Sequence, residues 1–174
     1  MSTVVASDKA HDLLKAPASV AIVRSTGDVI VADTAHHRIL RIAPAGDVIV
    51  LAGSGKPGHA DGIGVQAQFK EPEGVAVDDM RGVIYVADSG NHLVRSVTFG
   101  GAVATLAGSG RPEDKDGPGA EAGFKQPSGI AVDATGMIVV ADGGNSRIKQ
   151  VTPAGQVTTI AGDVHAGFAD GPAN

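Results

Sequence analysis

The sequence contains no cysteine and no tryptophan, and aromatic residues make up only 3% of its 174 residues. Without cysteine there is no disulfide framework, thiol nucleophile or thiolate metal ligand. No apolar run approaches the roughly 20 residues of a membrane-spanning helix. Residues 1–9 lack a basic segment followed by an apolar core and make a poor signal peptide. We therefore expect a soluble protein, and the sequence leaves its location open.

Positive charge is also scarce. The formal net charge is −5, the isoelectric point is near 5.6, and lysine and arginine do not cluster. Binding to a phosphate backbone needs concentrated basic charge, so a nucleic-acid partner is disfavoured. The apolar residues, 43% of the chain, are chiefly small or β-branched. Such residues suit tightly stacked sheets.

One seven-residue stretch recurs at almost constant spacing. It occupies residues 86–92, and near-copies occupy residues 31–37 and 140–146. Asp88 lies 55 positions after Asp33, and Asp142 lies 54 positions after Asp88. A period of this length is typical of propellers, solenoids and repeat arrays. A proline opens each unit, and the sequence divides into an N-terminal segment (1–16) and three blades (17–71, 72–126 and 127–174).

Each unit reads as four short strands separated by turn signals. In the second unit we expect them at residues 74–78, 83–87, 92–97 and 102–107. The first two are nearly continuous in apolar residues, while the outer two alternate with polar residues. A continuous apolar run indicates burial on both faces, and alternation indicates a half-exposed strand. An inner pair buried between neighbours is what a propeller blade requires.

Long connectors, residues 53–69 and 108–124, join the units. Phe69 and Phe124 each stand three residues before the next proline, and we expect them to anchor the crossing between blades. A third connector begins at Gly162. Residues 3–8 resemble residues 158–163, which indicates either a strand remnant of an earlier blade or a frayed terminus.

The recurring motifs resemble the NHL repeat. They are a Pro-x-Gly-(Val/Ile)-Ala-Val opening, a Val-Ala-Asp-x-x-Asn-His core, an Arg-Ile or Leu-Val strand and a Thr-(Leu/Ile)-Ala-Gly ending, and they cover residues 17–171. The resemblance implies an all-β propeller, usually of six blades, with four antiparallel strands per blade around a central channel. The first unit departs from the pattern, with Ser19 in place of a glycine and His36 in place of an asparagine.

Three units are too few to close a ring, which needs about four to eight blades. Nine residues separate Gly62 from Pro72, whereas three follow Gly171 and six, residues 11–16, precede Pro17. Joining those two ends restores nine residues and puts Leu14 in the place of Phe69. We therefore expect homodimerisation, with two three-bladed chains closing one six-bladed ring. The alternative is a fragment of a longer propeller.

Several repeated polar residues are candidate site residues, and each has a structural interpretation. Asp33, Asp88 and Asp142 each precede a turn, and we expect them to cap it. His37 and His92 share a repeat position that is Ser146 in the third unit, so we expect hydrogen bonds in turns or between blades there, and no metal site.

The connectors hold further candidates. His59 and His165 lack the spacing of a zinc site, so we expect solvated loops there. Residues 53–58 are rich in glycine but lack the Gly-Lys-Ser/Thr ending of a phosphate-binding loop. Asp61, Asp116 and Asp170 each precede a glycine and are interpreted as turns.

Two classes of function follow. The first is a non-enzymatic scaffold or interaction module that binds a protein or small ligand at the loop face or channel. The alternative, implied by the resemblance, is a metal-dependent lyase or lactone hydrolase. The inner strands carry no metal-binding side chains within them, and Asp78 and Asp133 stand only at their ends. Twofold symmetry could bring their copies together. The sequence predicts no catalytic residue, metal site or cofactor. It predicts a chain that associates with itself and that has neither a nucleic-acid nor a membrane partner.

Overall fold

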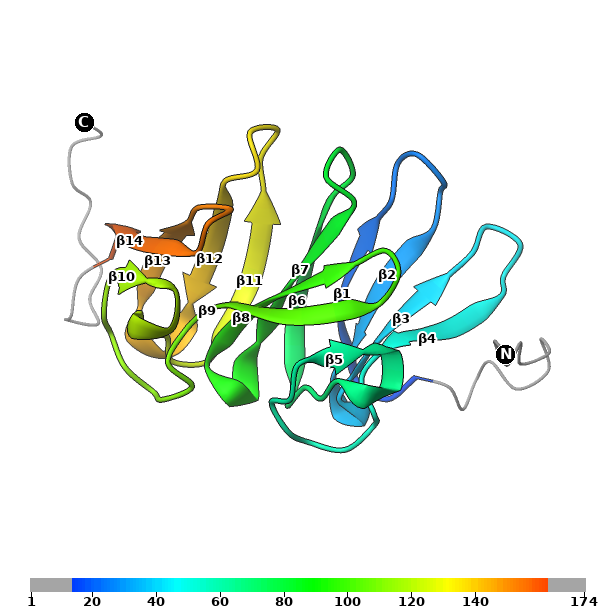
Figure 1. The fold of residues 1–174 in the computed structure, drawn as a ribbon, viewed down its shortest axis with the longest axis horizontal. Helices are drawn as coiled ribbons and strands as arrows, with labels where there is room; N and C mark the ends of the chain where they lie inside the picture. The colour runs from blue at the N-terminus through cyan, green and yellow to red at the C-terminus, as the bar shows by residue number, and fades with distance from the viewer. Residues whose placement is uncertain (1–13, 163–174) are drawn as a thin grey trace.

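The protein is described over residues 14–162 by a computed structural model, in which three antiparallel sheets spread like a fan (Figure 1). The first sheet contains β1 (Pro17–Ile22), β2 (Val29–Asp33), β3 (Arg38–Ile42) and β4 (Val48–Ala52). The second contains β5 (Gly62–Ile63), β6 (Pro72–Asp78), β7 (Val83–Asp88), β8 (Leu93–Thr98) and β9 (Ala102–Ala107). The third contains β10 (Gly117–Pro118), β11 (Pro127–Val132), β12 (Ile138–Asp142), β13 (Arg147–Val151) and β14 (Gln156–Ala161).

The predicted all-β fold and the four consecutive strands of each unit are confirmed. Each sheet runs in chain order from an inner strand (β1, β6 or β11) to an outer strand (β4, β9 or β14). We call the three sheets blades 1, 2 and 3. The expected strand remnant in residues 1–10 and the connector beyond Gly162, with His165 and Asp170, lie outside the described residues.

A short 3-10 helix follows the second strand of each blade. These are η2 (Thr34–His36), η4 (Ser89–Asn91) and η6 (Gly143–Asn145). Each ends at a left-handed residue with φ between 53° and 59°, namely His37, His92 or Ser146. Two more, η3 (Gly64–Gln66) and η5 (Gly119–Glu121), lie in the connectors. Within residues 14–162 no helix is long and apolar enough to cross a membrane.

The connectors contribute strands that the sequence does not predict. β5 leaves blade 1 and pairs with β9 of blade 2, and β10 leaves blade 2 and pairs with β14 of blade 3. The turns expected at Asp61-Gly62 and Asp116-Gly117 are therefore wrong, because the glycine in each pair starts a strand. Residues 62–63, which the repeat pattern assigns to the first unit, belong by hydrogen bonding to the second sheet.

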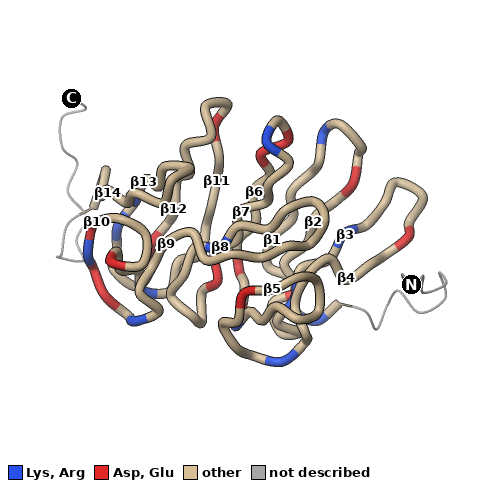
Figure 2. Tube along the Cα trace, in the orientation of Figure 1, with Lys and Arg blue, Asp and Glu red and all other residues tan. Residues whose placement is uncertain are grey.

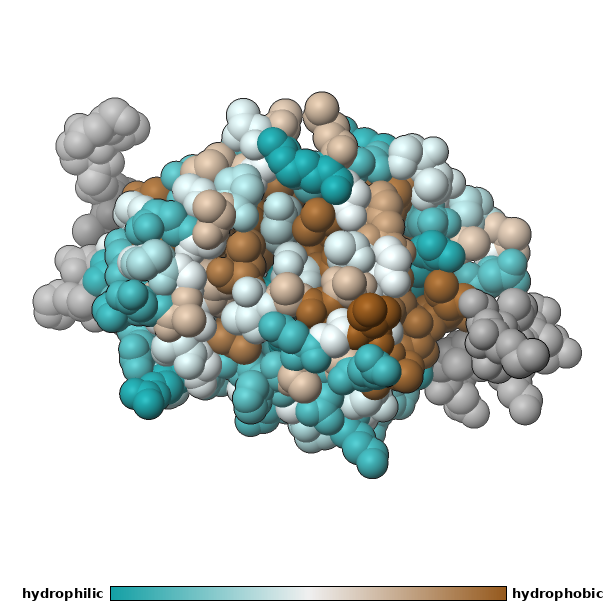
Figure 3. Space-filling view, in the orientation of Figure 1, coloured by the Kyte–Doolittle hydropathy of each residue, from teal (hydrophilic) through white to brown (hydrophobic). Residues whose placement is uncertain are grey.

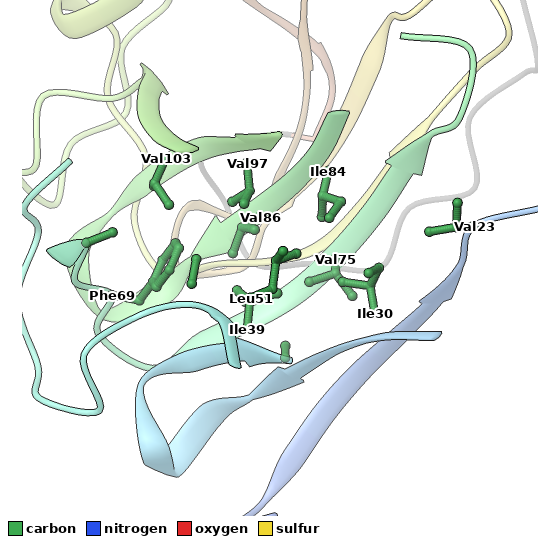
Figure 4. Close-up of a cluster of buried hydrophobic side chains, with 13 residues drawn as sticks. Val23, Ile30, Ile39, Leu51, Phe69, Val75, Ile84, Val86, Val97 and Val103 are labelled. Atoms are coloured by element: carbon green, nitrogen blue, oxygen red, sulfur yellow. The ribbon is translucent and has the colours of Figure 1, made fainter. Parts of the chain in front are cut away.

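The core lies between blades. Figure 4 shows one cluster, in which Ile30, Ile39 and Leu51 of blade 1 meet Val75, Ile84 and Val86 of blade 2. A second cluster joins Tyr85 and Val94 of blade 2 to blade 3. Phe69 and Phe124 are fully buried in these two clusters, which confirms their predicted role at the crossings.

Each blade has two distinct faces. The front face carries Val or Ile at six register positions, which in blade 1 are Val20, Ile22, Val29, Val31, Ile42 and Val48. The same positions in blade 2 are Val75, Val77, Ile84, Val86, Val97 and Val103, and in blade 3 Ile130, Val132, Ile138, Val140, Val151 and Val157. The back face includes Ile39, Leu51 and Ala52 in blade 1. Each front face within the chain packs on the back face of the preceding blade.

The expected burial of inner strands on both faces holds only for blade 2. Val75 in β6 is 4% exposed, whereas Val20 and Ile22 in β1 are 65% and 61% exposed. Blade 2 has a neighbouring blade on each side, but within residues 14–162 no other blade packs on the front of blade 1, where Val31 and Leu40 are nevertheless buried. Figure 3 shows further apolar surface beside β4 and β5, where Ile63 and Val65 are exposed.

Candidate functional site: the concave face of the inner strands

The three inner strands lie side by side and create a cavity where they end. β6 packs against both β1 and β11, and the ends of all three line a cavity of about 390 Å³. Its walls include Ala21, Ala76 and Val132, and its rim includes Arg24 and Asp79. Figure 2 shows both signs of charge on the loops at this end. The arrangement offers small apolar walls under a mixed polar rim.

The rim carboxylates are already engaged. Asp79 accepts the Ser25 N–H at 2.8 Å and the Ser25 hydroxyl at 2.6 Å, a contact that joins blades 1 and 2. Asp78 accepts the Arg81 N–H at 3.0 Å and pairs with its guanidinium at 2.9 Å. The same guanidinium donates to the Thr135 carbonyl of blade 3 at 2.8 Å. These loops therefore tie neighbouring blades together at the cavity mouth.

Asp133 bonds within its own turn. It accepts the Thr135 hydroxyl at 2.7 Å and the backbone N–H groups of Thr135 and Met137. The Thr135 hydroxyl and the Met137 N–H hold the pKa of Asp133 below its ordinary value. Asp78 and Asp133, the two inner-strand carboxylates noted in the sequence, thus line one cavity, each with its own partners.

Small residues surround the opposite end of the inner strands. A second cavity, of about 230 Å³, is lined by Ser19, Gly74 and Gly129 with their neighbours. Ser19, which departs from the glycine of the other units, accepts the Val75 N–H at 3.2 Å. This departure from the motif therefore adds a bond between blades 1 and 2.

The repeated aspartates have a structural role that differs from the predicted one. Asp33, Asp88 and Asp142 are fully buried, and none of them caps the turn that follows it. Each accepts a backbone N–H from the chain entering its blade, at Lys15, Lys70 or Lys125, at 2.7 to 2.8 Å. The entering chain bends at positive φ directly after that lysine. The lysine N–H thus finds its acceptor in the carboxylate, and capping of the local turn is wrong.

Asparagine side chains complete these aspartate sites in blades 2 and 3. Asn91 and Asn145 donate from Nδ2 to Asp88 and Asp142 at 2.8 and 2.7 Å. In blade 1 the corresponding His36 places Nδ1 2.9 Å from Asp33. Burial raises the pKa of both Asp88 and Asp142.

The predicted role of the paired histidines in bonding between blades is confirmed. His37 accepts at Nδ1 the N–H of Glu71, directly before β6 of blade 2, and His92 accepts the N–H of Gln126, directly before β11 of blade 3, both at 3.1 Å. Burial and the nearby Lys70 lower the pKa of His92, which keeps the ring neutral and able to accept. Within residues 14–162 no three His, Cys, Asp or Glu side chains are grouped to hold a metal ion.

The structure contains two buried cations that the sequence analysis does not predict. Arg95 is fully buried and contacts Asp88 at 2.8 Å and Asp61 at 2.7 Å, and its guanidinium lies 5.3 Å from the Phe69 ring centre. Lys149 repeats this arrangement over Phe124. In blade 1 the two positions are Leu40 and Leu14. When the three repeats are aligned, a phenylalanine and a cation in blades 2 and 3 are replaced together by two leucines in blade 1. This joint replacement is the sequence signal that the two positions are in contact.

The connector aspartates hold each added strand in place. Asp61 accepts the N–H and hydroxyl of Thr105 at 3.1 Å, and Asp116 accepts those of Thr159 at 2.7 and 2.8 Å. Burial alone would raise the pKa of Asp61, but the Thr105 and Arg95 donors hold it below its ordinary value. His59 borders a separate cavity between connectors.

The fan of four-stranded units joined by outer-edge connectors defines the class: these are blades of the β-propeller type. The NHL repeat model matches residues 14–42, 69–95 and 124–151. The matches begin at Leu14, Phe69 and Phe124, which occupy equivalent places at the three blade entrances. The chain therefore belongs to the NHL-repeat family.

Relatives match the blades over part of their length. Human NHL repeat-containing protein 2 is 41% identical over 113 residues, which cover 64% of this chain and 15% of that protein. A solved protein of unknown function from Bacteroides thetaiotaomicron aligns with a TM-score of 0.69 at 25% identity, over 75% of this chain and 34% of its own. A virginiamycin B lyase from Staphylococcus aureus aligns at 0.55 and 14% identity, over 83% and 41%, which shows a shared fold alone.

Proposed function

We propose that the chain is a non-enzymatic interaction module that presents its concave face to a protein or small ligand. The observation that carries this proposal is the cavity of about 390 Å³ to which all three inner strands contribute. Its size lies in the range of ligand pockets, and a concave apolar surface with a few polar groups is the usual form of such sites. Arg24 at the rim supplies a polar contact that orients a ligand.

The rim chemistry favours binding over catalysis. A general base must be able to take a proton near neutral pH, and the lowered pKa of Asp133 makes its carboxylate a weak base there. Both Asp79 oxygens already accept bonds from Ser25. The bonds of Asp79 and Asp133 therefore support the shape of the cavity.

The alternative function is that of a metal-dependent lyase or lactone hydrolase. It draws on the position of Asp78 and Asp133 at one cavity and on the fold shared with a lyase. The test is hydrolysis of simple lactones by the whole chain with Zn²⁺, Mg²⁺, Mn²⁺ or Ca²⁺, compared with the Asp133→Asn variant. The proposal predicts no rate above buffer in either protein. A metal-dependent rate that Asp133→Asn abolishes would establish the enzyme instead.

Ligand binding is tested with a matched pair of loop variants. Ala134 lines the cavity, whereas Ala154 is an exposed alanine of the β13–β14 loop. Compounds and peptides that raise the melting temperature should lose that effect in Ala134→Arg and keep it in Ala154→Arg, because only the first arginine obstructs the cavity. Equal responses of both variants would move the binding surface away from the concave face.

We also propose that two copies of the chain close one six-bladed ring. The support is the front face of blade 1, where Val20 and Ile22 are exposed and which keeps the Val/Ile composition of the two front faces that are buried inside the chain. Ring closure buries that face and completes the channel around the cavity. A contiguous exposed apolar face otherwise favours association without a defined partner.

A further inference from the structure

The two ends of the fan present the two halves of a blade junction. Inside the chain, the back face of one blade packs on the front face of the next, once between blades 1 and 2 and once between blades 2 and 3. Blades 1 and 3 lie at opposite ends of the fan (Figure 1). Within residues 14–162 no other blade packs on the front of blade 1 or on the back of blade 3.

The back of blade 3 has the composition of the two back faces that are buried. The equivalent back-face positions are Ile39, Leu51 and Ala52 in blade 1, Val94, Leu106 and Ala107 in blade 2, and Ile148, Ile160 and Ala161 in blade 3. Ile39 and Val94 are fully buried under the next blade, whereas Ile148 is 36% and Ile160 is 52% exposed. Blade 3 therefore carries an apolar back face to which the chain itself supplies no blade within residues 14–162.

One polar contact recurs at both internal junctions. The left-handed residue after the 3-10 helix of the first blade is His37 or His92, and its Nδ1 accepts the N–H of Glu71 or Gln126 at 3.1 Å. Each donor stands directly before the inner strand of the next blade and has a φ of 50° or 51°. Because the atoms and the distance are the same twice, this contact marks how one blade is positioned on the next.

Both halves of this contact also stand at the ends of the fan. Ala16 lies directly before β1 with a φ of 50°, and Ser146 follows η6 with a φ of 54°. Both residues are exposed, and among residues 14–162 neither the Ala16 N–H nor the Ser146 hydroxyl has a hydrogen-bond partner. A serine hydroxyl can accept a hydrogen bond as a neutral histidine nitrogen does.

We infer that the junction between two copies repeats the internal junctions: the back face of blade 3 in one copy covers Val20 and Ile22 of the other, and Ser146 accepts the N–H of the partner's Ala16. The inference rests on the proposed ring and specifies the faces and the polar contact that make it. Serine is shorter than histidine, so this contact is weaker between copies than inside the chain. Twofold symmetry forms the junction twice per ring.

Two single variants of the whole chain, studied alone and mixed, test which faces meet. Val20→Asp puts a charge on the front of blade 1, and Ile160→Asp puts one on the back of blade 3. Both side chains are exposed, so each variant should fold. Alone, each variant would bury a charge at both junctions of its dimer and should be monomeric. An equal mixture should double the mass measured by light scattering, because the heterodimer collects both charges at one junction and leaves the other natural.

The matched control carries both substitutions in one chain. Val20→Asp with Ile160→Asp, mixed with Val20→Asp alone, should stay monomeric because no pairing of these two chains contains a natural junction. All mixtures are compared at the highest concentration that leaves the single variants monomeric. If Ile160→Asp dimerises alone, or if the mixed single variants do not associate, the back of blade 3 does not meet the front of blade 1, and the inference and the ring are both overturned.

Ser146→His tests the polar contact separately from the ring. Histidine occupies the same left-handed position in blades 1 and 2, so it should lower the dissociation constant of the dimer about ten-fold relative to Ser146→Phe, whose ring offers no acceptor at either junction. Sedimentation equilibrium at about pH 8, where the imidazole is neutral, gives both constants. Equal constants would overturn the contact of Ser146 with Ala16 and leave the ring in place. A natural chain that stays monomeric at every concentration would overturn both.

Discussion

At the scale of single residues, the most unusual feature is a pair of fully buried cations. Arg95 contacts Asp88, which is itself buried. Removing one partner of a buried ion pair leaves the other charge without compensation and typically costs 3–5 kcal/mol. In blade 1 the equivalent buried aspartate, Asp33, is compensated from a different position. Arg38 stands directly opposite Asp33 and donates to it from Nε at 2.7 Å.

This difference predicts a rescue. Arg95→Leu should lower the free energy of unfolding by about 3 kcal/mol or more. Adding Leu93→Arg, at the position equivalent to Arg38, should recover part of the loss because it returns a guanidinium to Asp88. Urea unfolding of both variants measures the effect. If the double variant is no more stable than Arg95→Leu, the loss of unfolding free energy does not come from the uncompensated charge of Asp88.

His92 gives the chain a pH dependence with a defined sign. Its pKa is lowered by burial and by Lys70, so the unfolded chain, with an ordinary pKa near 6.5, binds the proton first as pH falls. The stability that the neutral ring contributes is therefore complete above about pH 6.5 and is lost on acidification. Protonation also removes the Nδ1 acceptor of the Gln126 N–H.

His92→Asn is the matched test, since asparagine tolerates the left-handed backbone of this position. Between pH 7 and pH 5 the unfolding free energy of the natural chain should fall more than that of the variant. The difference should stay under about 1 kcal/mol, because solvent screens the partly exposed ring. Parallel pH profiles would exclude His92 as the titrating group.

At the scale of elements, the inner strands approach each other closely at one glycine. A Cβ on Gly74 would lie 2.1 Å from the Ser128 carbonyl oxygen of blade 3, whereas on Gly129 its nearest neighbour is 3.4 Å away. Gly74→Ala should therefore destabilise by about 1–3 kcal/mol through overpacking. Gly129→Ala should stay within about 0.5 kcal/mol of the natural chain. Thermal unfolding compares them, and equal losses would contradict the close approach of β6 and β11.

Strands were largely predictable from the sequence because local periodicity determines them. The expected strand at residues 102–107 coincides with β9, and the expected 92–97 differs from β8 by one residue at each end. β5 and β10 were not predictable in this way, since two-residue strands form only against another unit and Asp-Gly is also a turn signal.

The candidate site was predictable only in part. The sequence indicates Asp78 and Asp133 because they end inner strands, but their convergence on one cavity depends on the packing of β1, β6 and β11. The buried Arg95 and Lys149 look like ordinary surface charges in a hydropathy pattern. Asp88 accepts a hydrogen bond from the backbone N–H of Lys70, 18 residues earlier. Rules for local turns cannot predict a contact over that distance in sequence.

At the scale of the whole molecule, the ring proposal places Val20 in an interface between copies. Val20→Asp should abolish dimerisation while leaving the unfolding free energy of the monomer nearly unchanged, because the side chain is 65% exposed there. Val65→Asp, at 63% exposure on η3, is the control and should remain dimeric. Gel filtration with light scattering distinguishes the species. Two variants that both dimerise would remove the front face of blade 1 from the interface.

The most direct test of the whole account is the solution mass of the natural chain, measured by light scattering at micromolar concentration. The account predicts a mass near twice 17.3 kDa, since two fans of three blades close one six-bladed ring. A mass near 17.3 kDa would contradict the account and would leave the front of blade 1 to blades outside this sequence.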